Sequence, residues 1–360
     1  MTSGREEGTG GERYPWETIE AWAKAGDAEC IAALGEGLAA QRRATYERLG
    51  SLDRDLGFAL RVLALTPGRR FLEQLLALLG RAWEAHVKDE SGPRRIASLI
   101  ATAQPLDDAL YVLWESGREY DELRACLFHE LLLRGVNPEK LMPRQTFRPE
   151  PEGHDLAWLP DRLADMEYGA DTSDDGMLSP VWVDAAVRRA ATGHRLNEWA
   201  SADLLRLIGE SPRVGGWCNY EARVFVSDRS ISRDDVPGVL TTLPMDCVRG
   251  LDQYDRFEVE AYSLDKVWET LYTTAASGGM YHPGVHGAYG RLAAWRSIAG
   301  LCGAGATATA AAVAHRARAC AWYRFEADSE WFFNEIYDYG IAALTPDGRH
   351  LAVLAATDTD

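Results

Sequence analysis

The last twenty residues contain the pattern that most constrains the fold. Two short apolar runs, 341–344 and 351–356, flank the tetrapeptide Thr-Pro-Asp-Gly at 345–348. Proline fixes the backbone at the second position of a turn, aspartate can hydrogen-bond nearby main chain, and glycine tolerates a left-handed conformation. Apolar runs on both sides of such a turn predict an antiparallel hairpin. The chain is therefore expected to contain a sheet to which these residues contribute.

Other strand and helix patterns fill the second half of the chain. Residues 223–226 are β-branched and aromatic, residues 256–262 alternate charged with apolar side chains, and residues 320–326 are rich in aromatics, so all three predict strands. An α+β domain over residues 181–360 is therefore predicted, with a mostly antiparallel sheet, a C-terminal hairpin and helices on one face. The helices expected in this domain are 182–191, 196–208, 264–274 with Ser263 as its cap, 290–301 and 307–319.

The first part of the chain carries helical spacing only. Leu52, Leu56, Leu60 and Leu63 form an apolar stripe that stops at the breaker Thr-Pro-Gly of residues 66–68. Asp27 stands where a helix N-cap is expected. Similar stripes with short links predict an antiparallel helical array or bundle over residues 14–141. Two flanking segments complete the predicted organisation, namely a disordered tail at 1–13 and a proline-rich linker or crossing segment at 142–180.

Charge and cysteine content restrict the function classes. The formal net charge is −17, which argues against nucleic acid or an anionic membrane surface as the main partner because both require a basic face. The most apolar stretch, 304–314, is about half of the roughly 20 residues that a membrane span needs. The six cysteines are scattered without a C-x-x-C pair, so reduced thiols are expected. Together with the lack of a signal-like apolar run at the start, this predicts a cytoplasmic location.

The segment 277–291 is the strongest candidate for a site. It places glycines, two histidines, two tyrosines and an arginine between two expected helices. Glycines let the backbone approach a ligand, a helix start offers N–H groups to an anion, arginine holds a carboxylate or phosphate, and histidine moves protons near neutral pH. The same composition also fits a packed loop whose aromatic side chains fill the core. The predicted catalytic residues are His282, His286 and Tyr289, and the predicted ligand-binding residues are Gly278, Gly279, Tyr281, Arg291, Trp295 and Arg296.

Metal motifs are incomplete. His282 and His286 have a spacing that suits a metal on a helix, but a Pro-Gly pair lies between them. Residues 171–176 resemble the start of a calcium loop, yet Trp182 stands where the closing acid should be. The Asp-Thr-Asp of residues 358–360 is too short to indicate a metal site. No metal is therefore predicted, and because no phosphate-binding or dinucleotide motif is present, the cofactor is unknown.

Several C-terminal motifs carry a resemblance to a known family. The first motif is the run Gly287-Ala-Tyr-Gly-Arg-Leu-Ala-Ala-Trp-Arg-Ser297, which is followed by Trp331-Phe332 and Tyr339-Gly340. The turn Pro-Asp-Gly of residues 346–348 and the ending Leu-Ala-Val-Leu-Ala-Ala-Thr-Asp-Thr-Asp of residues 351–360 come after them, and Leu-Ala-Leu-Thr-Pro-Gly occurs earlier, at 63–68. These motifs resemble an uncharacterised family of actinobacterial, chiefly Streptomyces, proteins. The resemblance implies a soluble bacterial protein. It implies no activity, cofactor or catalytic residue.

Two functions are expected from these features. The first is a small-molecule-binding protein, which as an enzyme of bacterial specialised metabolism would act on an acidic ligand by general acid–base chemistry. The alternative is a protein–protein interaction or regulatory protein of the immunity or adaptor type, whose helical surface and acidity would favour a basic protein partner. The expected partners are thus a small acidic molecule or a basic protein, and neither nucleic acid nor membrane.

Overall fold

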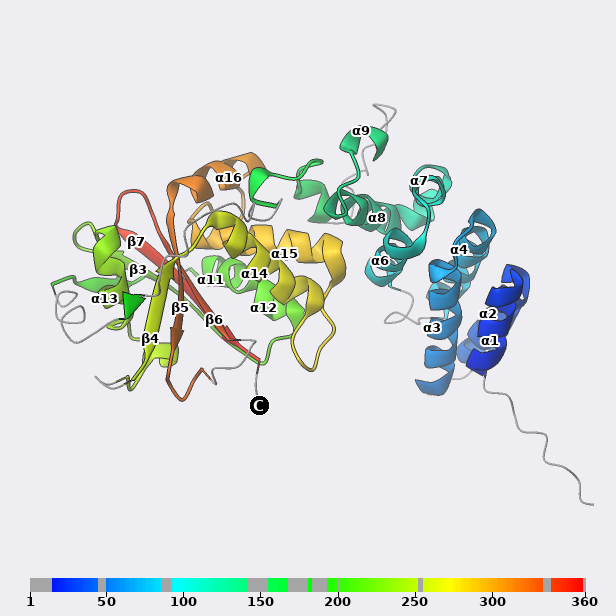
Figure 1. Cartoon of the computed structure of the whole chain (residues 1–360), viewed down its shortest axis with the longest axis horizontal. Helices are drawn as coiled ribbons and strands as arrows, with labels where there is room; N and C mark the ends of the chain where they lie inside the picture. The colour runs from blue at the N-terminus through cyan, green and yellow to red at the C-terminus, as the bar shows by residue number, and fades with distance from the viewer. Residues whose placement is uncertain are drawn as a thin grey trace, which may run out of the picture. The chain divides into compact units, whose positions relative to one another are not determined.

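The computed structural model describes residues 15–44, 50–85, 92–141, 155–167, 181–182, 193–199, 201–251, 255–332 and 338–358. The chain divides into two compact units, Met1–Phe128 and His129–Asp360 (Figure 1). The division falls inside helix α8 (Asp121–Leu133), so the last residues of this helix belong to the second unit. The expected tail at 1–13, the acidic loop at 171–176 and most of the expected linker lie outside the described residues.

The first unit is an array of helices, as predicted. Neighbouring helices pack on one another, α2 with α3 and α4, α3 with α6, and α4 with α7. The leucine stripe read from the sequence is the buried face of α3, where Leu56, Leu60 and Leu63 are fully buried. The helices of this unit that precede α8 are α1 (Pro15–Ala25), α2 (Ala28–Ala44), α3 (Gly50–Leu65), α4 (Arg69–Glu84), α6 (Pro93–Ala103) and α7 (Leu106–Glu115).

Side chains satisfy the backbone at two of the helix boundaries in this unit. Asp27 caps α2 as predicted, because its Oδ1 accepts a hydrogen bond from the Cys30 N–H at 3.1 Å. At the turn between α3 and α4, the buried amide of Gln104 accepts from the Gly68 N–H at 3.0 Å and donates to the carbonyls of Ala64 and Thr66 at 2.8 and 2.7 Å. One side chain thus pairs three main-chain groups that the turn leaves without helical partners.

The second unit is built on a seven-stranded sheet in which all neighbouring strands run antiparallel. The predicted terminal hairpin is confirmed as β6 and β7, with Leu344 opposite Leu351 and Gly348 in the left-handed region at φ 69°. The α+β fold class is therefore confirmed. The strands follow the order β1-β4-β5-β6-β7-β3-β2 across the sheet, and their bounds are β1 (Val181–Trp182), β2 (Leu196–Glu198), β3 (Asn219–Ser227), β4 (Phe257–Ala261), β5 (Ala321–Ala327), β6 (Tyr339–Leu344) and β7 (His350–Thr357).

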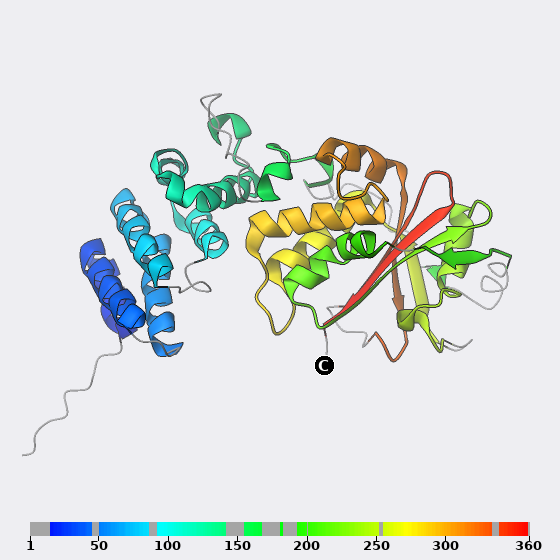
Figure 2. The same ribbon diagram turned by 180° about the vertical axis from the view of Figure 1, so that it is seen from behind.

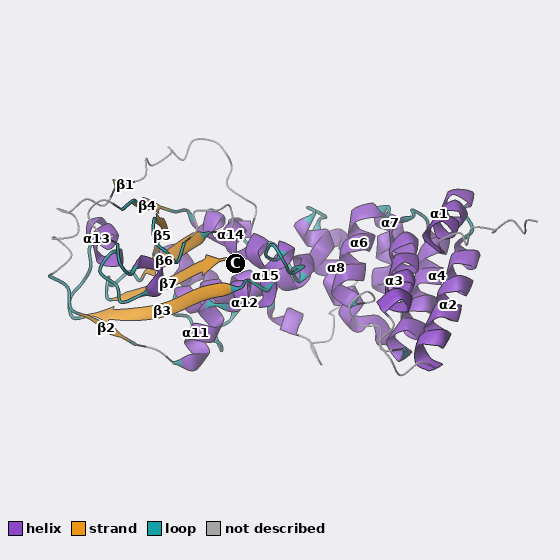
Figure 3. Cartoon of the chain, turned by 90° about the horizontal axis from the view of Figure 1, so that it is seen from below, coloured by secondary structure: helices purple, strands orange, loops and turns teal. Residues whose placement is uncertain are grey.

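Both faces of the central strands are covered. Phe225, Phe325 and Val353 point to one face, where they pack against the segment 231–248, which includes the short helix α13 (Val236–Leu240). Alternate residues point to the other face, which carries the helical layer (Figures 2 and 3). Every residue of β6 is buried, and after Tyr339 the strand carries only glycine and aliphatic side chains. The helices of this layer are α11 (Ala202–Ile208), α12 (Glu210–Gly215), α14 (Leu264–Ser277), α15 (His286–Leu301) and α16 (Ala310–Ala319).

Two expected helices need correction. Residues 196–198 are not helical, because they pair with β3 as the edge strand β2, with Leu196 opposite Ser227. The helix begins only at Ala202, after Ser201, whose hydroxyl accepts a hydrogen bond from the Leu204 N–H at 3.1 Å. Trp182, the first residue of the other expected helix, lies instead in strand β1, opposite Glu258. Residues 183–191 lie outside the described part.

All six cysteines are free thiols. Among the helices that are described, none combines the length and the apolar composition needed to cross a bilayer. No group of three or more His, Cys, Asp or Glu side chains in the described ranges is arranged to hold a metal ion.

Candidate functional site

The glycine-rich loop after α14 closes on one of the protein's own carboxylates. Gly278 ends the helix with φ 78°, and a side chain at Gly279 would overlap the carboxylate of Asp358. Asp358 is fully buried and accepts hydrogen bonds from the N–H groups of Cys218, at 3.0 Å, and Met280. The close approach that the glycines predicted is therefore present, but the group that is approached belongs to the chain itself.

A carboxylate of the protein itself also binds the start of α15. The Gly287 N–H donates to Oε1 of Glu130 at 2.7 Å, and Glu130 is buried at the end of α8. The second oxygen of Glu130 accepts from Arg134 at 2.5 Å. A carboxylate at this position is stabilised by the N-terminal end of the helix dipole and by the unpaired N–H groups there. The anion site expected at this helix start is thus occupied by Glu130.

Arg291 does not have the role predicted for it. Its guanidinium is fully buried and forms a two-pronged ion pair with Glu167, with Nε–Oε1 at 2.5 Å and a second N–O distance of 2.9 Å. The remaining N–H groups donate to the carbonyls of Pro160 and Arg162, both at 2.9 Å, and to Nδ1 of His129 at 2.8 Å. All five N–H donors of an arginine are then used, so none is left to clamp a ligand. Arg291 instead ties the segment 155–167 to α15.

The predicted catalytic residues are spread along the loop and the start of α15. His282 is exposed and lies against Gly216, where an added Cβ would meet its side chain. His286 and Tyr289 are half-buried, and His286 has a positive φ of 62° as the first residue of α15. Tyr281 is 54% exposed. None of these four residues lines either of the two clefts described below, and their proposed catalytic or binding roles stay predictions.

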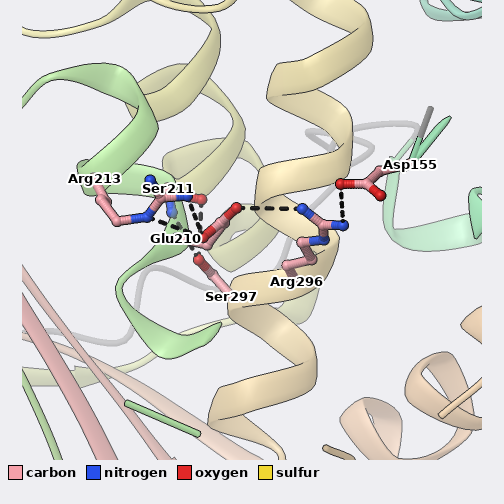
Figure 4. A network of polar contacts seen from close by, with 6 residues as sticks. All are labelled: Asp155, Glu210, Ser211, Arg213, Arg296 and Ser297. Atoms are coloured by element: carbon pink, nitrogen blue, oxygen red, sulfur yellow. Dashed lines mark hydrogen bonds and ion pairs between the residues drawn. The ribbon is translucent and has the colours of Figure 1, made fainter. Parts of the chain in front are cut away.

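Trp295 and Arg296 lie on the next turns of α15. Trp295 is buried, and its ring meets that of Trp158 edge to face at a centroid distance of 6.1 Å. The guanidinium of Arg296 lies between two carboxylates, at 2.7 Å from Asp155 and 3.3 Å from Glu210 (Figure 4). Arg296 is the one predicted arginine that reaches a cleft.

A buried polar network fixes the start of α12 against α15 behind Arg296. Glu210 accepts from Arg213 at 2.7 Å as well as from Arg296. Beside it the Ser211 N–H donates to the Ser297 hydroxyl at 3.0 Å, and the two serine hydroxyls are 3.1 Å apart (Figure 4). Because Glu210, Ser211 and Ser297 are buried, these bonds hold the backbone around Arg296 in one arrangement.

The cleft next to Arg296, called here the polar cleft, has a volume of about 450 Å³. The exposed guanidinium of Arg206 forms no hydrogen bond or ion pair with any residue in the described ranges. Two arginines thus face one hollow, and only Arg296 is already paired. The lining residues are Asp155, Trp158, Arg206, Leu207, Arg296, Ala299, Gly305 and Ala306.

A second hollow, the apolar cleft, has a volume of about 290 Å³ and lies over the helical face of β3 and β7. Aliphatic side chains of α11, β3, α15 and β7 line it, together with a few polar groups. Arg316 donates through Nε to the Cys302 carbonyl at 3.2 Å, and its terminal nitrogens have no partner within the described residues. The lining comprises Trp199, Ser201, Asp203, Leu204, Leu207, Val224, Gly300, Leu301, Gly303, Gly305, Ala306, Arg316, Thr345, His350 and Ala352.

The two clefts are neighbours, because Leu207, Gly305 and Ala306 line both of them. The thiols of Cys302 and Cys320 lie near this region, but burial raises their pKa to about 12 and about 11, so they stay protonated and unreactive. The two clefts can therefore bind a ligand that has an acidic group for the arginines and an apolar part for the aliphatic side chains. Neither of these two thiols is an activated nucleophile.

Sequence reasoning missed both clefts because they are assembled from distant segments, 155–158, 201–207, 296–306 and 345–352. One signal was present in the Gly- and Ala-rich stretch after Leu301, which follows a helix as the loop at 277–291 does.

The fold and these clefts define an α+β protein with a helical N-terminal unit and a two-part hollow on its sheet unit. The chain belongs to a family of unknown function (DUF6183), whose family model matches residues 14–360. The expected resemblance to an uncharacterised family is confirmed at this level. No curated protein and no solved structure is similar enough to the chain to count as a match.

Proposed function

We propose that this protein binds a small organic acid across the junction of the two clefts. The acidic group would lie at Arg206 and Arg296 in the polar cleft, and the apolar body would lie over Leu207 in the apolar cleft. The observation that carries the proposal is the shared wall, since Leu207, Gly305 and Ala306 line both hollows. Small-molecule sites are usually concave, mostly apolar and oriented by a few polar groups, and the two clefts together fit that description.

The arginines supply the selectivity for an acid. A guanidinium matches a carboxylate in planar, two-pronged fashion and is less strongly hydrated than an ammonium. Arg206 is exposed without a protein partner among the described residues, so binding there breaks no existing contact. The net charge of −17 repels an anion at long range, but at physiological salt the screening length is about 8 Å, so the two nearby arginines dominate.

Binding has more support than catalysis. His350 lines the apolar cleft and could exchange a proton, and its Nδ1 lies 3.8 Å from Oδ2 of Asp347. That distance exceeds a hydrogen bond, so the carboxylate does not orient the ring as a general base requires. The expected acid–base reaction therefore stays a prediction. The interaction role expected as the alternative also stays a prediction, which a pull-down at two salt concentrations would test.

Calorimetric titration of the full-length protein tests the proposal. The panel is octanoate, phenylacetate and benzoate, each compared with its neutral amide. At least one acid should bind, and its amide should bind about tenfold more weakly or worse, because a hydrogen bond to a charged group contributes about 1.5–3 kcal/mol. Arg206→Gln should remove most of the difference between acid and amide.

A blocking variant locates the site. Ala306 is exposed and lines both clefts, so Ala306→Trp should fill the junction and abolish binding while leaving the core intact. The matched control is Ala311→Trp, at an exposed alanine on α16 that lines neither cleft. Failure of every acid to bind, or equal binding by wild type and Ala306→Trp, would contradict the proposal.

A further inference from the structure

We infer that Asp155 is an internal carboxylate that occupies the ligand's place on Arg296 and leaves it when an organic acid binds. The inference rests on the proposed function. It adds the chemical class of the acidic group, a carboxylate, and a device that keeps Arg296 paired while the site is empty. The basis is the contrast between the two acids that share this arginine (Figure 4).

The two carboxylates on Arg296 are held very differently. The side chain of Glu210 is 4% exposed and also pairs with Arg213, so it is part of the buried network that supports α12. The side chain of Asp155 is 64% exposed and pairs with Arg296 alone, at 2.7 Å. An exposed ion pair contributes about 0–1 kcal/mol, whereas a buried carboxylate cannot leave its partners without a large loss. Asp155 is therefore the contact that a ligand can replace.

The backbone that follows Asp155 is held by hydrogen bonds, so replacement is proposed to require only a rotation of the Asp155 side chain. Asp155 begins the short helix η2 (Asp155–Trp158), and the indole N–H of Trp158 donates to the Ala308 carbonyl at 3.0 Å. Farther along, the carbonyls of Pro160 and Arg162 are held by the buried Arg291. The segment thus stays in place while the exposed carboxylate turns toward solvent.

The position that Asp155 occupies also indicates what the cleft accepts. A carboxylate oxygen already lies at hydrogen-bond distance from the guanidinium of Arg296, inside the lining of the polar cleft. A ligand carboxylate at the same place would have Arg206, on the same lining, for its second oxygen. A monocarboxylate with an apolar body satisfies both clefts, and it reproduces a contact that the fold already makes.

Removal of the internal competitor should strengthen binding. In full-length Asp155→Asn, the affinity for octanoate should rise about two- to fivefold, which corresponds to the worth of an exposed ion pair. The affinity for octanamide should not change, because the amide does not compete with a carboxylate for Arg296. Asp155→Ala should give the same result. Because alanine has no amide group, this variant excludes a new contact between the asparagine side chain and the ligand as the cause.

The matched control is Asp165→Asn, which removes the same charge from the same segment. Asp165 pairs with Arg318 at 3.0 Å, its side chain is 91% exposed, and it lines neither cleft. Its affinity for octanoate should equal that of the wild type. Octanoate affinity that is unchanged or lower in both Asp155 variants would overturn this inference alone, whereas failure of every acid of the panel to bind any form of the protein would contradict the proposed function. Octyl phosphate that binds more tightly than octanoate would overturn the assignment of a carboxylate.

Discussion

The two ends of α15 differ in what neutralises their anion-attracting groups. At the N-terminal end, Glu130 accepts from the Gly287 N–H and Glu167 pairs with Arg291. In the loop before the helix, Asp358 accepts from the Met280 N–H, and all three acids are buried. Near the C-terminal end, Arg206 has no partner in the described part of the chain, and one of the two carboxylates on Arg296, that of Asp155, is exposed. Glycine and arginine in a loop therefore indicate that a carboxylate is bound nearby, and they do not indicate whether it comes from the chain or from a ligand.

The largest expected effect concerns Arg291. Arg291→Ala leaves Glu167 buried without its partner, and breaking a buried pair in this way costs about 3–5 kcal/mol. Denaturant unfolding of the sheet unit should show a loss of this size. The predicted role as a ligand clamp would instead leave stability unchanged and abolish binding, so this one variant separates the two interpretations of the N-terminal end.

A surface pair provides the control for Arg291. Arg324 and Glu326 form an ion pair in which both side chains are more than a third exposed. Arg324→Ala removes the same type of residue from the same unit, and its cost should stay below about 1 kcal/mol because water screens the pair. Equal losses from the two arginine variants would show that the burial of Arg291 is not what makes it structural.

An intermediate effect is expected at Asp358. In Asp358→Asn one of the two acceptor oxygens becomes an NH₂ group, so either the Cys218 or the Met280 N–H loses its partner. Losing a hydrogen bond to a charged acceptor costs about 1.5–3 kcal/mol. The amides of Cys218 and Met280 should exchange hydrogen faster, and octanoate affinity should not change. Asp234→Asn, at an exposed acid without a hydrogen bond or ion pair in the described ranges, serves as the control. Weakened octanoate binding in Asp358→Asn would show that the two ends of α15 are coupled, and it would contradict the separation of a structural end from a ligand-binding end.

Local patterns predicted the fold better than the site. The β6–β7 hairpin and the Asp27 cap depend on residues that are neighbours in sequence, and both are confirmed. The short edge strand at 196–198 depends on its pairing with β3, so its own residues do not reveal it. The partners of α15 are farther away still, with a sequence separation of 157 from Glu130 to Gly287 and of 124 from Glu167 to Arg291. One sequence without its tertiary contacts cannot show that these acids are the anions of the predicted site.

The smallest expected effect lies at the edge of the apolar cleft. The Thr345 hydroxyl donates to the Asp347 carboxylate at 2.6 Å and the Arg349 N–H donates at 3.0 Å, and these bonds lower the pKa of Asp347 from its usual 3.8. A carboxyl group whose pKa is lower in the folded state stabilises the fold above its unfolded pKa, and this contribution disappears as the pH falls through the folded value. The stability difference between wild type and Asp347→Asn should therefore be constant from neutral pH down to about pH 4 and shrink below it. Because the carboxylate is exposed, the difference should be far smaller than that for Arg291→Ala, and urea unfolding at a series of pH values measures it. If the wild type is instead less stable than Asp347→Asn at neutral pH and gains stability relative to the variant as the pH falls, the carboxylate destabilises the turn, and this prediction is contradicted.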